Sequence, residues 1–401
     1  DTIKGFSHIH AWQLSGVSVL PVDLGKIDEK SVGKDYYSSF DHAKEKVSPG
    51  YHKLHLDRYD IDVELTSTKR VGFHRYHYNS DNGAILVNLS GPLGPSKIVE
   101  GSLAQIEPRV LEGELTNAPT RRRPKPTKVF FRIVLDRDVK EMSSLTEDGK
   151  FLLKLEKGKG EVKMKVALSY TSLENAKFNL DEELPHWDFD KIVDESRSEW
   201  NNLLGRIKVE GDSDKQKQRF YTDLWHALQG RRTISDANGY YPDNTGDIFK
   251  IKQLPLSTDG KPLFDHYNSD SFWGAQWTIN TLWQLVYPEI AEGFANSLLQ
   301  YYKDGGLVPR GPAGGNYTYV MTGASSTPFL VGAYQKGIRG FDIEMAYAAL
   351  RKNHMPGGIM DKAGYEHNTN LGGGLKYYLE QGYVPYPIPE GNFGYHQNGP
   401  S

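Results

Sequence analysis

The chain has 401 residues, with 48 Lys and Arg against 51 Asp and Glu, and it contains no cysteine. This length leaves room for about two or three domains, and 38% hydrophobic residues is typical of a folded globular protein. The missing cysteine excludes disulfides, thiolate metal sites and a cysteine nucleophile. A net charge of −3 argues against a nucleic-acid partner, and no apolar run approaches the roughly 18 residues of a membrane span.

The first part of the chain alternates apolar and polar residues with a period of two. Residues 61–66 and 162–170 show the alternation, and residues 129–135 form a more continuous apolar run. Clusters of Gly, Pro, Asn and Asp separate these runs. One-sided strands at this density predict antiparallel sheets packed face to face, so we expect a β-sandwich over residues 1–181.

Beyond residue 181 the apolar residues recur at helical spacing. Helices are predicted over residues 192–207, 216–229 and 291–302, the last ending at Gly305-Gly306, and Asp342 can cap a further helix that runs to residue 352. The first of these is expected to form a linker helix within residues 182–210. Helices separated by long Gly- and Pro-rich loops predict a ring with its loops at one mouth, so residues 211–401 are expected to form part of an (α/α)6 toroid.

Aromatic residues are abundant, with 24 Tyr and 7 Trp, and their flat faces suit carbohydrate as well as sheet packing. The loop from Gly5 to Gly16 holds His8, His10 and Trp12. Two histidines on one side of an extended segment are compatible with a metal, but no third ligand lies nearby in the sequence. We therefore expect this loop to present His10 and Trp12 to a polar ligand.

Three further segments carry candidate chemistry. Asp270 and Trp273 precede a predicted helix, which fits either a sugar cleft or a capped helix whose tryptophans, Trp277 included, are core; both interpretations remain open. Arg310 stands on a Pro–Gly turn, where a guanidinium can donate paired hydrogen bonds to hydroxyls or carboxylates. The basic run over residues 120–127 contains two prolines and is expected to be a solvated loop between strands.

Taken in order, several strings resemble glycoside hydrolase family 92, the calcium-dependent exo-α-mannosidases, and the resemblance covers almost the whole chain. It begins with Gly-Phe-Ser-His-x-His followed by Leu-Ser-Gly within residues 5–16. The other matching strings occur in the family's order: Phe40-Asp41-His42, Ser48-Pro49-Gly50-Tyr51, Val63-Glu64-Leu65-Thr66-Ser67-Thr68, Gly72-Phe73-His74-Arg75-Tyr76, residues 216–228, Leu307-Val308-Pro309-Arg310 and residues 333–339.

The resemblance implies a β-sandwich that begins before Asp1 and packs on a catalytic (α/α)6 barrel. It implies an exported, inverting enzyme that releases terminal mannose from α-mannosides or N-glycans, with calcium on the sugar hydroxyls. The family's acid, base and main calcium ligands correspond to positions C-terminal to Ser401. No catalytic or metal-binding residue is therefore expected in this chain, which is expected to be inactive without the missing C-terminal part.

By the same resemblance, one group of substrate-binding residues lines the mouth of the active site: His10, Trp12, Ser15 and Gly16. A second group belongs to the sugar pocket: Asp270, Trp273 and Arg310. Two departures stand out, because many members have Asp where this chain has Gly274 and His where it has Ser325. The alternatives are a non-catalytic carbohydrate-binding or structural piece, and another toroid glycosidase or a phosphorylase.

Overall fold

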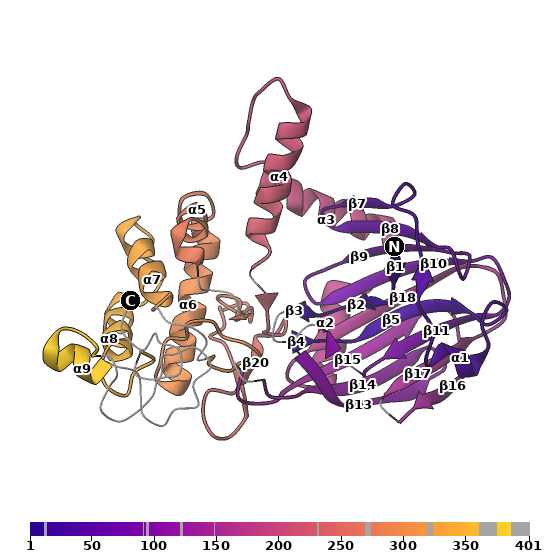
Figure 1. Cartoon of the computed structure of the whole chain (residues 1–401), viewed down its shortest axis with the longest axis horizontal. Helices are drawn as coiled ribbons and strands as arrows, with labels where there is room; N and C mark the ends of the chain where they lie inside the picture. Colours follow the sequence, from indigo (N-terminus) through magenta and orange to yellow (C-terminus); the bar gives the residue numbers. More distant parts are fainter. Residues whose placement is uncertain are drawn as a thin grey trace. The chain divides into compact units, whose positions relative to one another are not determined.

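The computed structural model describes residues 1–11, 14–90, 92–93, 96–120, 123–147, 149–230, 232–268, 274–318, 324–360 and 375–385, with only the backbone described at His10, Ala11, Pro92 and Leu93. These residues form two compact units (Figure 1). Unit 1 comprises Asp1–Ala118 and Thr127–Tyr221, and unit 2 comprises Pro119–Pro126 and Thr222–Ser401.

Unit 1 is built from two antiparallel sheets. The larger has nine strands in the order β12-β13-β14-β15-β18-β10-β9-β8-β7, and the smaller has five in the order β16-β17-β11-β5-β2. The bounds of the large sheet are β12 (Pro92–Leu93), β13 (Ser96–Glu107), β14 (Val110–Asn117), β15 (Thr127–Leu135), β18 (Gly160–Ser169), β10 (Val71–Tyr78), β9 (Ile61–Ser67), β8 (Tyr51–Leu56) and β7 (Lys46–Ser48). Those of the small sheet are β16 (Val139–Thr146), β17 (Lys150–Leu155), β11 (Gly83–Asn88), β5 (Ser18–Asp23) and β2 (Phe6–Ser7).

The core of unit 1 lies between these sheets, as the period of two predicts. Along β15 every second residue is buried, including Val129, Phe131 and Ile133, which are fully buried. Residues of the small sheet such as Ile85 and Leu153 belong to the same apolar cluster. The predicted β-sandwich is confirmed. Two small pairings complete the unit: β1 (Thr2–Ile3) with β6 (Ser38–Ser39), and β3 (His10–Ala11) with β4 (Leu14–Ser15).

Helices cover the outer face of the large sheet. Helix α2 (Leu173–Glu183) and helix α3 (Phe189–Leu204) bury apolar side chains against β10 and β18, where Phe73 lies 5.1 Å from the Phe189 ring. A third, short helix, α1 (Glu29–Val32), is capped by Asp28. The segment expected as a linker thus contains α3, whose first turns pack on the sheet through Phe189, Ile192 and Val193.

Unit 2 is mainly helical. Its described helices are α5 (Ile279–Val286), α6 (Pro288–Gly305), α7 (Ser326–Gln335), α8 (Ile343–Asn353) and α9 (Leu375–Gln381), preceded by α4 (Asp214–Leu228), which spans the boundary between the units. The helices predicted from the sequence correspond to α4, α5, α6 and α8, whereas the sequence patterns did not predict α7 and α9. Helix α6 ends at Gly306 in the left-handed conformation, and Asp342 caps α8 by accepting the Met345 N–H at 2.8 Å, both as predicted.

An aromatic cluster holds these helices together. The Phe294 ring of α6 lies 5.9 Å from Trp283 of α5, 5.4 Å from Phe329 of α7 and 5.3 Å from Tyr267. The loops contain short strands that the sequence did not predict: β19 (Arg232–Thr233) with β22 (Tyr267–Asn268), and β20 (Tyr240–Asp243) with β21 (Lys250–Gln253).

Two segments between the predicted elements differ from simple expectation. In the basic run between β14 and β15, Pro124 and Pro126 are exposed as expected of a solvated loop, but Arg123 is fully buried. Of the two open interpretations of the tryptophans before α5, the core one does not hold for Trp277, which lies on a 3₁₀ turn (η1, Ala275–Trp277) and is 68% exposed. Tertiary packing therefore buries an arginine that polarity places in solvent and exposes a tryptophan that hydrophobicity places in the core.

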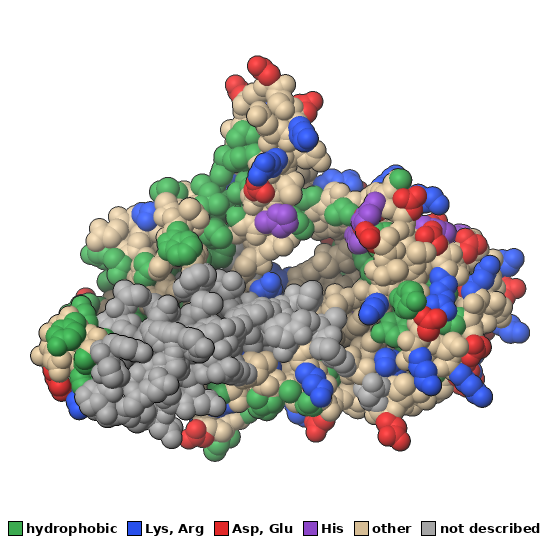
Figure 2. Space-filling model, in the orientation of Figure 1, with side chains coloured by type: hydrophobic (Ala, Val, Ile, Leu, Met, Phe, Trp, Pro, Cys, Tyr) green, Lys and Arg blue, Asp and Glu red, His purple; other side chains and the backbone are tan. Residues whose placement is uncertain are grey.

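The surface of unit 1 carries both signs of charge in alternation. Figure 2 shows Lys and Arg interspersed with Asp and Glu over the visible face of the sandwich. None of the helices in the described ranges has the length and hydropathy that crossing a bilayer requires.

Candidate functional site

In the segment from Gly5 to Gly16, the described residues are paired rather than open: residues 6–11 lie antiparallel to residues 14–19, and we call these two strands the hairpin. The His8 N–H donates to the Val17 carbonyl at 3.0 Å and the Gly16 N–H to the Ile9 carbonyl at 3.1 Å, while the backbones of His10 and Ser15 are paired. Trp12 lies outside the described residues, as does the side chain of His10. The structure thus pairs two of the predicted binding residues, His10 and Ser15, through their backbones.

Gly16 is required by close packing inside this hairpin. A Cβ at this position would lie 2.7 Å from the Ile9 Cβ and 2.9 Å from the Ile9 nitrogen. These distances are shorter than real Cβ contacts, so any side chain here would push the two strands of the hairpin apart. Gly16 therefore shapes the hairpin through its lack of a side chain.

Ser15 is held by one buried amide. Its N–H donates to Asn117 Oδ1 at 2.8 Å, and its carbonyl accepts from Asn117 Nδ2 at 2.9 Å. The Ser96 hydroxyl donates to the same Oδ1 at 2.6 Å, and all three residues are fully buried. The Asn117 amide replaces the pairing that a neighbouring strand would provide, and so anchors the second strand of the hairpin to the large sheet.

A chain of hydrogen bonds anchors the first strand. His8 Nδ1 lies 2.8 Å from the Val17 carbonyl, His8 Nε2 lies 2.8 Å from His74 Nε2, and His74 Nδ1 lies 2.8 Å from the Tyr76 hydroxyl. Burial lowers the pKa of His8 to about 4 and that of His74 well below 6.5, so both rings are neutral.

Because both rings are neutral, the position of each proton in this series of hydrogen bonds is fixed. A carbonyl only accepts, so His8 carries its proton on Nδ1 and accepts at Nε2. His74 must then donate from Nε2 and accept at Nδ1, which makes the Tyr76 hydroxyl the donor. We call His8, His74 and Tyr76 the histidine relay; it joins the hairpin to β10 of the large sheet.

A cavity of about 260 Å³ lies beside the histidine relay. The polar side chains around it already bond to the protein: Ser7 to the Ile9 carbonyl at 2.6 Å, Thr66 to the Gly50 carbonyl at 2.8 Å and Thr68 to Glu183 at 2.6 Å. The geometry of this region therefore serves to position the hairpin. The cavity is lined by Phe6, Ser7, His8, Leu65, Thr66, Ser67, Thr68, Lys69, Arg70, Val71, Gly72, His74 and Leu168.

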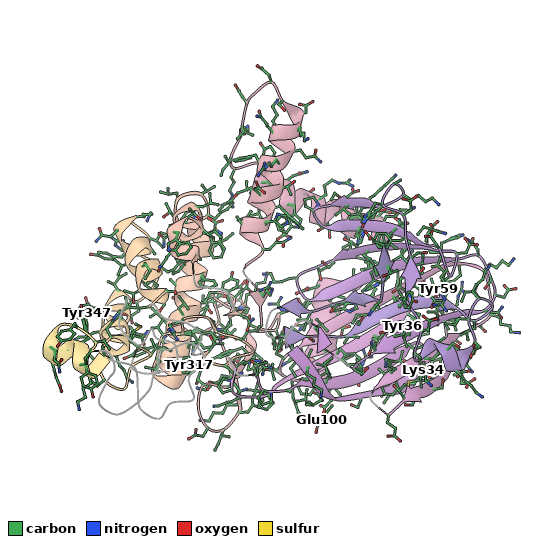
Figure 3. The ribbon with its side chains drawn as sticks, in the orientation of Figure 1. Lys34, Tyr36, Tyr59, Glu100, Tyr317 and Tyr347 are labelled. Carbon is green, nitrogen blue, oxygen red and sulfur yellow. The ribbon has the colours of Figure 1, made fainter. Side chains whose placement is uncertain are left out.

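In unit 2, the candidate site is the loop that follows α6. Every residue from 307 to 318 is buried, and Arg310 is only 4% exposed. The Tyr317 hydroxyl (Figure 3) accepts the Leu307 N–H at 3.1 Å and lies 2.9 Å from the Tyr301 carbonyl. The Asn353 amide bonds both backbone groups of Val308, at 3.1 and 2.8 Å. Side chains thus satisfy a backbone that is neither helix nor strand.

Two asparagines hold Gly314 of this loop. Asn268 Oδ1 accepts its N–H, and Asn316 Nδ2 donates to its carbonyl at 3.1 Å. The remaining amide atoms, Asn268 Nδ2 and Asn316 Oδ1, are buried and have no hydrogen-bond partner among the described residues. An unpaired buried polar atom costs about 1–3 kcal/mol. The open Asn268 Nδ2 is a donor and the open Asn316 Oδ1 is an acceptor, and a ligand hydroxyl can accept from the one and donate to the other.

His266 supplies a further atom of this kind. The ring stacks on Tyr301 at 4.3 Å and lies 4.4 Å from Tyr241, and its Nδ1 is 3.1 Å from the Ser297 hydroxyl. Its Nε2 has no partner among the described residues. Burial lowers the pKa of His266 to about 3, against the opposing effect of Asp243, so the imidazole is neutral and suited to hydrogen bonding rather than to charge.

The buried carboxylates of unit 2 form an ion-pair network. Lys252 Nζ lies 2.9 Å from both Asp243 and Asp304, and the Tyr241 hydroxyl donates to Asp304 at 2.7 Å. Burial alone would raise the pKa of Asp243, but hydrogen bonds from Thr245 and Lys252 outweigh it and the pKa is lowered. The two carboxylates share one ammonium, and this ion-pair network ties β20 and β21 to α6.

Within the described ranges, no three or more His, Asp or Glu side chains are grouped so that they could hold a metal ion. Calcium takes six to eight oxygen ligands, from carboxylates, backbone carbonyls, amides and water. The predicted residues Asp270 and Trp273 lie outside the described residues.

Sequence reasoning did not predict Asn117, Asn268 or Asn316 as binding or positioning residues. Asn117 is the last residue of β14, and Asn316 closes a turn by exchanging backbone hydrogen bonds with Ala313, so both stand at positions where asparagine is common. Their burial is what distinguishes them. His74 had a signal, because it lies within one of the strings that carry the family resemblance.

Comparison with known proteins places this geometry in a family. The model of the glycosyl hydrolase family 92 N-terminal domain matches residues 1–180, and that of the family's catalytic domain matches residues 175–399. No curated protein matches significantly.

Solved structures share the fold. The family GH92 α-mannosidase BT3965 from Bacteroides thetaiotaomicron has a TM-score of 0.77 at 23% identity, with 93% of this chain and 50% of that chain covered. The same protein was also solved with mannoimidazole. The family GH92 inverting mannosidase BT2199 from the same organism has a TM-score of 0.79 at 23% identity, with 96% and 52% covered.

The chain spans about half the length of these structures. At this identity the likeness shows the fold, in which a β-sandwich is followed by part of an (α/α)6 toroid. The two family models together match the chain from residue 1 to residue 399. With its sandwich and its helical unit both matched, the chain belongs to glycosyl hydrolase family 92.

Proposed function

We propose that the protein containing this chain is a glycoside hydrolase that releases terminal mannose from α-mannosides, N-glycans included, with inversion of configuration and with calcium. The observation that carries the proposal is the match of both family domains along the chain. Of the solved structures that share its fold, one is described as an α-mannosidase and another as an inverting mannosidase.

The buried polar atoms of unit 2 support sugar binding. Arg310 can donate to hydroxyls, and the open amide atoms of Asn268 and Asn316 offer a donor and an acceptor. Sugars are recognised by such convergent polar groups in a concave, mostly buried site. We propose that this chain contributes residues that bind the sugar. Asp243 and Asp304 are not assigned a catalytic role, because both are already ion-paired with Lys252.

The test is an assay of the protein that contains this chain with an aryl α-mannoside. We expect release of mannose, β-mannose as the first anomer seen by NMR, loss of activity with a chelator and recovery with calcium. Release of an α-anomer would contradict inversion, and full activity in the chelator would contradict the calcium requirement.

Two other outcomes would replace the proposal. Binding of mannosides without turnover by the calcium-loaded protein would identify a carbohydrate-binding protein. Release of a sugar phosphate only in the presence of phosphate would identify a phosphorylase.

We also propose that the protein is exported, as members of the family it resembles are. Fractionation of the source cells tests this, and recovery with the cytosolic markers would contradict it.

A further inference from the structure

The connection between β14 and β15 leaves the sandwich and belongs to unit 2. We call residues 119–126 the β14–β15 loop. Its turn is closed by the Thr120 N–H donating to the Arg123 carbonyl at 2.7 Å and by the Arg123 N–H donating to the Thr120 hydroxyl at 2.8 Å. Arg123 is fully buried, and its Nη1 donates to the Lys125 carbonyl. This turn aims Lys125 at the segment after β20.

The β14–β15 loop holds Asn244. The Asn244 side chain donates from Nδ2 to the Pro126 carbonyl at 2.9 Å, and the Asn244 carbonyl accepts from Lys125 Nζ at 3.2 Å. Lys125 Nζ also donates to the Gly246 carbonyl. Asn244 is only 5% exposed. Its side chain and its carbonyl are therefore both set by the β14–β15 loop.

The remaining backbone group of Asn244 reaches the candidate sugar site. The Asn244 N–H donates to the Gly315 carbonyl at 3.2 Å. Gly315 has a φ of +74°, and a Cβ there would lie 2.4 Å from the Pro242 carbonyl. Asn244 thus supports Gly315, while Asn268 holds the neighbouring Gly314.

We propose that Lys125 and Asn244 are positioning residues for sugar binding. They hold the Gly314–Gly315 pair in place, and with it the amides of Asn268 and Asn316, whose open atoms face the ligand under the proposed function. The inference rests on that function. Hydrogen bonds to a substrate lose much of their effect when the groups that make them move by about 1 Å.

The first test measures hydrogen–deuterium exchange of the whole protein and needs no activity. Lys125→Met removes the donors of Lys125 and keeps its aliphatic stem, and Lys125→Arg restores a donor. In Lys125→Met we expect amide exchange in residues 311–318 to rise about tenfold, with α6 unchanged as an internal reference. Lys128→Met is the matched control, because Lys128 lies on β15 and pairs only with exposed Glu114 among the described residues.

The second test measures kinetics with an aryl α-mannoside. Lys125→Met should lower kcat/KM about tenfold, mainly through KM, and Lys125→Arg should recover most of the loss. Asn244→Asp, which keeps the size of the side chain and removes its donor, provides a second variant if Lys125→Met does not fold.

Unchanged exchange in residues 311–318 would overturn the proposal, whatever the activity. A uniform rise that includes α6 would also overturn it, because it would show general destabilisation. If the wild-type protein releases no mannose while exchange still rises only in residues 311–318, the positioning stands and the proposed function fails.

Discussion

At the residue scale, a single buried amide holds the second strand of the hairpin. In Asn117→Ala the N–H and C=O of Ser15 lose the two hydrogen bonds that they make with the Asn117 amide, in a fully buried place. Because removing one partner of a buried hydrogen bond costs about 1–3 kcal/mol, we expect the free energy of unfolding of unit 1 to fall by about 2–4 kcal/mol in urea titrations. Asn202→Ala is the control, since Asn202 is exposed on α3. A loss no larger than that of the control would contradict the bridging role.

Arg310 is the predicted binding residue whose position in unit 2 is described. If its guanidinium contacts the sugar, Arg310→Lys should lower kcat/KM for an aryl α-mannoside. We expect the loss of transition-state stabilisation to be about 1–3 kcal/mol, because an ammonium cannot make paired hydrogen bonds in one plane. Trp12→Ala should weaken binding of the leaving group by a similar amount. Wild-type kinetics in either variant would remove that residue from the site.

At the scale of elements, the histidine relay makes the attachment of the hairpin to β10 sensitive to acid. The folded pKa values of His8 and His74 lie below the unfolded value of 6.5. The unfolded chain therefore binds protons first as the pH falls, so stability is complete above pH 6.5 and is lost toward pH 4.

The contribution of His74 to this loss can be measured separately. His74→Gln removes a titrating group and should flatten the slope of unfolding free energy between pH 6.5 and 4.5 by up to about 1.4 kcal/mol per pH unit. His77→Gln is the control, because His77 is exposed on the same strand. Equal slopes in both variants would contradict the role of the relay.

The connection between α2 and α3 makes stability depend on pH in the alkaline range. Lys165 Nζ lies 4.1 Å from the centre of the Trp187 ring and donates to the Leu184 carbonyl at 3.0 Å, and burial lowers its pKa to about 8. Between pH 8 and 10.5 the unfolded chain holds the proton that the folded chain has lost, so stability should rise with pH in that range. Lys165→Met should abolish this rise in urea titrations, and Lys163→Met on the same strand should retain it.

At the scale of the whole molecule, the charge distribution predicts that the protein does not bind DNA. The net charge is −3, and on the visible face of the sandwich Lys and Arg are interspersed with Asp and Glu instead of forming the basic stripe that releases counterions from DNA (Figure 2). We expect no retention on duplex DNA at 150 mM salt, on the order of physiological ionic strength. Micromolar binding with a steep dependence on salt would contradict this expectation.

The architecture was accessible from sequence because it depends on short-range patterns. The alternation along β15 and the helical spacing along α6 reflect which face each element buries, and Asp342 and Gly306 mark ends through bonds to nearby residues. The family resemblance added the order of the domains. The short strands around β20 escaped prediction because their pairing depends on the neighbouring loop.

The sequence by itself determined the two kinds of layer, the end of α6 at Gly306, the start of α8 at Asp342 and the family. Only the tertiary structure decided that His8 pairs with His74, 66 positions away, that Asn117 holds Ser15 across 102 positions, and that Arg123 is buried in unit 2. The physical reason is the same in each case. A polar side chain has no periodicity to reveal its partner, and its role appears only when folding buries it beside a group that must be hydrogen-bonded.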